Sequence, residues 1–88
     1  MQLIQTEPFG THNRNFDIHT YRDTNNDSLV IEPVETTAGH KENVSHFKAY
    51  VPMKGIFDLP PEDYPEYQGA LAAVKELLST HVLSSTPQ

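Results

Sequence analysis

The side chains best suited to chemistry in this sequence are its histidines, since imidazole binds metals and transfers protons near neutral pH. There are five of them, at His12, His19, His40, His46 and His81. Two imidazoles reach one metal ion from a strand or a helix when they lie two, three or four residues apart. No two of these histidines have that spacing. We therefore expect no metal site, and a site made by His40 and His46, across a loop, is the alternative.

A second arrangement with chemical potential is Asp17 with His19. Residues two apart on a strand project from the same face, so the carboxylate could hold the imidazole as a general base. Ser28 and Ser45 are available nucleophiles, but neither lies in the sharp glycine-flanked turn that presents a catalytic serine. A domain of this size also has little room for a deep pocket. We expect no enzymatic activity, with a small His19-dependent enzyme as the alternative.

Composition and charge argue against several classes of partner. The four glycines are far apart, so no phosphate-binding loop is present and no cofactor is expected. The net charge is −6, and the six basic residues do not form the cluster that phosphate binding requires. No apolar run approaches the roughly 20 residues of a membrane span, and the first residues do not resemble a signal peptide. We expect a cytoplasmic protein that contacts neither nucleic acid nor membrane directly.

The chain is short, and this limits its stability. Its 88 residues predict a single domain over residues 1–88, and a domain of that size buries only about 60–65% of its unfolded surface. The absence of cysteine excludes disulfides. Small domains without such links often gain stability from a partner subunit. We therefore expect the chain to associate with itself or with another protein.

The elements that must position these side chains begin with a C-terminal helix. Tyr67, Leu71, Val74 and Leu78 recur at the spacing of one helical stripe. The predicted helix spans about 61–83, starts near Pro61 or at Pro65, buries Leu77 as well, and leaves a frayed tail at 84–88. No other segment reads as a helix, so the stripe must pack on a β-sheet made by residues 1–57.

The clearest strand signal is a hairpin over residues 16–36. Residues 16–22 alternate between apolar and polar, residues 23–28 are rich in Asn and Asp, which favour turns, and residues 29–36 form the return strand. Pro33 cannot donate a hydrogen bond to a ladder, so we expect it at an edge, a bulge or a strand end.

Two further strands complete the predicted sheet. One spans residues 1–5 and ends before the Glu7–Gly10 segment, and the other spans residues 44–53 after a polar loop at 37–43. Ile56 and Phe57 are expected to pack beneath the helix start. The predicted fold class is therefore α+β: a mainly antiparallel meander of three to four strands, in β-β-β-β-α order, with one amphipathic helix on one face.

One helix can cover only one face of this sheet. Alternation places Phe16, Ile18 and Val51 beneath the helix, and it sends other side chains to the opposite face. Those are Tyr21, His19, Tyr50 and Lys48. Tyrosines on an uncovered face are typical of protein interfaces. We expect this face, or a strand edge, to be the surface through which the chain forms a homodimer or binds a partner.

The segment from Phe47 to Pro52, followed by a turn and then the helix around residues 70–77, resembles HicB-type antitoxins. In that family a strand ending in valine-proline leads into a helix. The likeness covers about thirty-five residues, and the acidic 59–67 linker and the long N-terminal hairpin depart from it. The resemblance implies a regulator that acts through a partner protein, and no functional residue is carried over.

Overall fold

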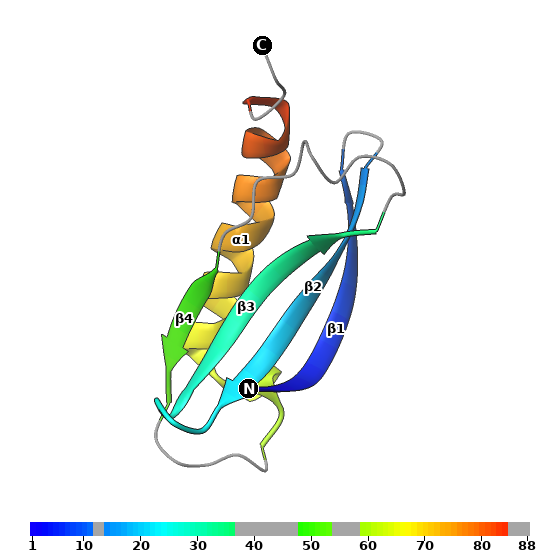
Figure 1. Cartoon of the computed structure of the whole chain (residues 1–88). Coiled ribbons are helices and arrows are strands. Elements are labelled where there is room, and N and C mark those ends of the chain that lie inside the picture. The colour runs from blue at the N-terminus through cyan, green and yellow to red at the C-terminus, as the bar shows by residue number, and fades with distance from the viewer. Residues whose placement is uncertain (12–13, 37–47, 54–58, 85–88) are drawn as a thin grey trace.

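The computed structural model describes residues 1–11, 14–36, 48–53 and 59–84. Four strands come first: β1 (Gln2–Thr11), β2 (Arg14–Asp23), β3 (Ser28–Glu35) and β4 (Ala49–Pro52). A short 3-10 helix, η2 (Pro61–Asp63), and the helix α1 (Pro65–Ser84) follow. The strands form one antiparallel sheet in the order β1-β2-β3-β4, with α1 on one side of it (Figure 1). The predicted α+β meander with one C-terminal helix is therefore confirmed.

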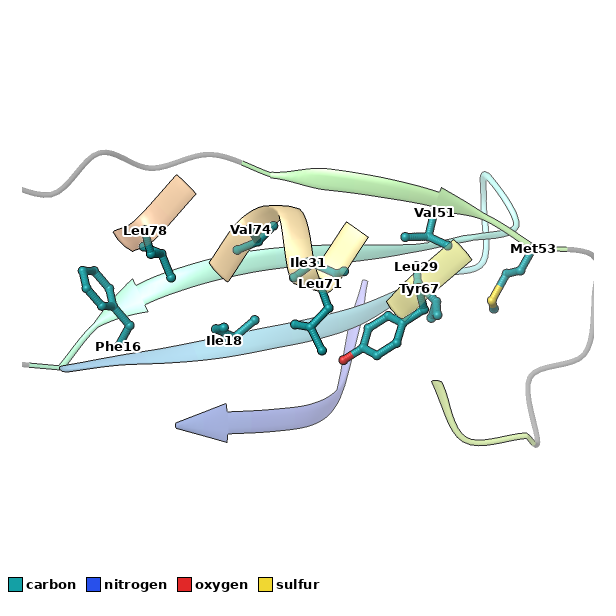
Figure 2. Packing of buried hydrophobic residues seen from close by; sticks show 10 residues of the cluster. All are labelled: Phe16, Ile18, Leu29, Ile31, Val51, Met53, Tyr67, Leu71, Val74 and Leu78. Carbon is teal, nitrogen blue, oxygen red and sulfur yellow. The ribbon is translucent and has the colours of Figure 1, made fainter. Parts of the chain in front are cut away.

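The core lies between α1 and the sheet. All four residues of the predicted helical stripe, Tyr67, Leu71, Val74 and Leu78, are buried. Figure 2 shows them facing apolar side chains of the sheet and of Met53, the residue after β4; those of the sheet are Phe16, Ile18, Leu29, Ile31 and Val51. The prediction that Leu77 is also buried is wrong, since it is 36% exposed. One residue step turns a helix by about 100°, so Leu77 and Leu78 cannot both face the sheet squarely.

Both candidate starts of the helical region mark real boundaries. Pro61 opens η2, in which the Tyr64 N–H donates to the Pro61 carbonyl at 3.0 Å, and α1 itself begins at Pro65. Proline suits both positions because the N–H groups of a first turn have no partner within the helix. The expected packing of Ile56 and Phe57 lies outside the described residues, as do residues 85–88 of the expected frayed tail. Ser84, which the prediction placed in that tail, is the last residue of α1.

The predicted hairpin is formed by β2 and β3. Asp23 organises the turn: one carboxylate oxygen accepts from the Asn25 N–H at 3.1 Å, and the other accepts from the Asn26 amide at 2.9 Å. Asp27 takes the left-handed conformation, with φ of 53°. Asp and Asn favour such turns because their side chains bond to nearby backbone groups and tolerate positive φ.

The prediction that the first strand ends before Glu7 is wrong, because β1 continues through Pro8 to Thr11. The hydrogen-bond pattern shows why proline is tolerated there. The Thr36 N–H donates to Asn15 O, so Asn15 and, by alternation, Asp17 direct their backbone groups toward β3. Pro8 is paired with Asp17, and its nitrogen therefore points away from β2, out from the sheet edge. No ladder bond is lost.

The pairing also fixes the direction of the Pro33 nitrogen, in the inner strand β3. Pro33 is paired with Ile18, a residue whose backbone groups point toward β1, so the Pro33 nitrogen points to the β4 side. On that side the described pairing stops at Ile31 and Ala49, two residues earlier. The prediction of a position near a strand end is confirmed. Of the predicted strand at 44–53, residues 44–47 lie outside the described residues.

Candidate functional site

Two surfaces of the described chain could take a partner or a ligand. The first is an open groove of about 500 Å³ between β1 and α1, which we call the β1–α1 groove. The second is the side of the sheet opposite α1, which we call the open face. It is defined by Leu3, Tyr21, Val30 and Tyr50, one from each strand.

Two of the three charged residues that line the β1–α1 groove, Lys75 and Glu7, are already paired with each other. Lys75 donates to a carboxylate oxygen of Glu7 at 2.6 Å, and its ammonium group lies 5.9 Å from the centre of the Phe9 ring. Both side chains of the ion pair are about one-third exposed, so their attraction is partly screened by solvent. A ligand would have to break this pair to use either charge. The pair therefore holds β1 against α1, and its two charges are engaged with each other rather than with a ligand.

The most buried polar residue that lines the groove is Tyr67, and its polar group is the hydroxyl. It lies 3.0 Å from the hydroxyl of Thr20, which is fully buried, and it accepts a hydrogen bond from the Gln5 amide at 3.3 Å. Burial raises the pKa of the Tyr67 phenol above its ordinary value of 10.0, and the charges of Glu7 and Glu62 raise it further. This cluster joins β1, β2 and α1 through side-chain hydrogen bonds.

We expect the stability of the chain to fall as the pH rises above about 10, in part because of Tyr67. The phenol holds its proton more tightly in the folded chain than in the unfolded one. Its contribution is complete below the unfolded pKa of about 10 and is lost as the pH rises through the higher folded pKa. Urea unfolding measured at neutral and alkaline pH checks this.

Tyr67→Phe is the matched control for that measurement. At neutral pH it should cost about 1–3 kcal/mol, because it leaves the buried Thr20 hydroxyl without its partner. Above pH 10 its stability should fall less steeply than that of the native chain. Parallel pH dependences of the two proteins would show that the Tyr67 proton is not linked to folding.

The open face carries an apolar row that crosses the whole sheet. Backbone pairing aligns Leu3 with Tyr21, Tyr21 with Val30, and Val30 with Tyr50. The two ends of the row are well exposed, Leu3 at 46% and Tyr50 at 63%, whereas Val30 between the two tyrosines is fully buried. None of the four belongs to the cluster beneath α1. The sheet therefore presents apolar side chains on the face that the helix leaves uncovered.

A polar row lies beside the apolar one. Pairing aligns Thr6 with His19 and His19 with Glu32. Lys48 directly precedes β4, and the register of β3 and β4 places it level with Glu32. The His19 Nδ1 atom lies 3.2 Å from the Tyr21 hydroxyl, and the two rings meet edge to face. All four residues of the predicted interface, Tyr21, His19, Tyr50 and Lys48, are thus at least partly accessible.

The structure bears differently on the groups first considered for catalysis. Tyr21, rather than Asp17, is the side chain that contacts the His19 ring through a hydrogen bond. Ser28 is buried and paired with Asp23, four residues along β2 from His19, which separates the two by roughly 13 Å. A direct Ser28–His19 pair is therefore not formed. Ser45 lies outside the described residues.

Within the described ranges, no group of three or more His, Asp or Glu side chains is placed to hold a metal ion. His40 and His46, the alternative metal pair, lie outside these ranges. Among the same residues, no helix has the length and apolarity to cross a bilayer.

The edges of the sheet are poorly suited to pairing with another strand. On β1 the outward-pointing residues include Pro8, as described above. On β4 the Met53 N–H donates to Asp27 O, so the intervening Pro52 points its nitrogen outward. Proline at such a position removes a donor that an added strand would need, a common protection of sheet edges. Of the two predicted interfaces, the geometry favours the open face over an edge.

Sequence reasoning identified the tyrosines of the open face but missed Leu3. The residue lies in the weakly patterned first strand, and only its pairing with Tyr21 brings it into the apolar row. The shift in register between Leu3 and Gln5 further obscures the alternation along β1. Val30 could have indicated the apolar row, because the hairpin register aligns it with Tyr21. A single sequence does not fix that register.

No family model, curated protein or solved structure matches this chain.

Proposed function

We propose that this chain is a small, non-enzymatic protein-interaction module that associates with a second copy of itself through the open face. The observation that carries the proposal is the row of Leu3, Tyr21, Val30 and Tyr50 across the uncovered side of the sheet. Tyrosine beside aliphatic side chains is the composition that protein interfaces favour, because the rings bury a large area at a small cost in side-chain entropy.

The size of the open face sets the expected strength of association. Strands lie about 4.8 Å apart and rise about 3.3 Å per residue. Four strands of about eight residues therefore offer roughly 500 Å² in projection, below the roughly 800 Å² per partner of a standard interface. The net charge of −6 on each copy also opposes association. We expect a reversible dimer with a dissociation constant in the micromolar range.

Sedimentation equilibrium of the native chain over a wide range of concentration tests the proposal. The average mass should rise smoothly from that of one 9.9 kDa chain toward that of two. A single-chain mass up to millimolar concentration would overturn self-association through this face.

A further inference from the structure

The rows of the open face also predict how two copies fit together, an inference that rests on the proposed function above. We infer that the dimer has a two-fold axis parallel to the strands, located between β2 and β3, so that β2 of each copy faces β3 of the other. Such an axis keeps every residue at its level along the strands and reverses the order of the strands. Each row of one copy therefore meets the same row of the second copy, read backward.

Reversal makes the apolar row complementary to itself. Leu3 of one copy lies opposite Tyr50 of the second copy, and Tyr21 lies opposite Val30. The exposed Tyr50 ring of each copy thus meets the exposed Leu3 side chain of the other, whereas Val30 is fully buried within its own chain and adds no contact. A two-fold axis perpendicular to the strands would instead place each tyrosine against its own equivalent and Val30 against Val30. That arrangement sets the exposed Tyr50 rings against each other and Leu3 against Leu3, whereas close packing favours a large side chain opposite a smaller one.

The polar row is complementary under the same operation. Its order across the sheet is Thr6, His19, Glu32 and Lys48. Reversal places His19 of each copy opposite Glu32 of the other, and this contact occurs twice. When the Tyr21 phenol donates to His19 Nδ1, the ring proton lies on Nε2 and is available to the facing carboxylate. Hydrogen bonds of this kind fix the register of an interface that its apolar centre alone would leave free to slide.

The ends of the polar row give a test that leaves the apolar anchors intact. Thr6 on β1 and Lys48, which directly precedes β4, are both exposed, so the inferred axis places each opposite the other in the second copy. Facing sheets lie about 10 Å apart, whereas two Thr6 residues of one dimer would be displaced sideways by roughly 14 Å as well. The chain has no native cysteine, so introduced thiols are unique reporters.

The experiment mixes Thr6→Cys protein with isotope-labelled Lys48→Cys protein and adds the short crosslinker bismaleimidoethane, with products identified by mass. The inferred geometry gives crosslinked heterodimers in the mixture and no crosslinked dimer from either variant alone. Glu76→Cys, on the outer side of α1, replaces Thr6→Cys in a control mixture, which should give no product.

Two results would overturn the inference. One is a crosslinked dimer from Thr6→Cys or Lys48→Cys alone. The other is an absence of the mixed product although sedimentation shows that both variants dimerise. In either case the inferred axis is wrong while self-association stands. If the native chain itself does not dimerise, both the proposed function and the inferred axis are wrong.

Discussion

Leu78→Ala should destabilise the chain by about 3–5 kcal/mol, the range found when a fully buried leucine leaves a cavity. Leu78 is completely buried where the end of α1 packs on the sheet beside Phe16 (Figure 2). A small domain has few other contacts to compensate, and each kcal/mol shifts the melting temperature by about 4–8 °C. Calorimetry at one fixed protein concentration is the appropriate measurement, because dimerisation makes the melting temperature depend on concentration.

The neighbouring residue provides a matched control. Leu77→Ala makes the same chemical change on the same helix, but at a side chain that is 36% exposed. We expect a loss of less than about 1 kcal/mol, because an exposed leucine gains little from burial. Equal destabilisation by the two variants would contradict the packing of α1 described here.

Tyr50→Lys should weaken self-association at least 30-fold, which corresponds to the roughly 2 kcal/mol of an interface hot spot. The substitution replaces an exposed ring of the apolar row with a charge, and the inferred dimer would bury that charge against Leu3 of the second copy. Tyr50 is 63% exposed in the single chain, so folding itself should change by no more than about 0.5 kcal/mol. Sedimentation equilibrium and thermal unfolding separate the two effects.

Leu77→Lys is the control for that substitution. It also replaces an exposed apolar residue with lysine and changes the net charge by the same amount, but it lies on α1, across the sheet from the open face. The dissociation constant of this variant should stay close to that of the native chain. Because the added positive charge lowers the repulsion between two copies of net charge −6, general charge cannot weaken the dimer, and equal weakening by both variants would show that association does not depend on the open face.

The sequence was most informative where the pattern is local. The buried stripe of α1 follows from spacings of three and four residues, and the Asp23 turn follows from the chemistry of Asp and Asn side chains. The separation of Tyr21 and Tyr50 from Phe16 and Val51 follows from alternation along single strands. Each of these features depends on residues that lie within a few positions of one another in the chain.

Features that depend on pairing between distant residues could not be predicted from local sequence patterns. Pro8 looks like the end of a strand until its pairing with Asp17 shows that its nitrogen points outward. Leu3 joins the apolar row only through Tyr21, and the Glu7–Lys75 ion pair joins residues 68 positions apart. Register and the approach of a helix to an edge strand are set by the whole core, so no short window contains them.

The central claim is that the face left uncovered by α1 is where this chain associates with itself. Sedimentation equilibrium of the unmodified protein, from low micromolar to millimolar concentration, tests this claim most directly. We predict a reversible rise in average mass from one chain to two, with a micromolar dissociation constant. A mass that stays at one chain throughout would contradict the claim.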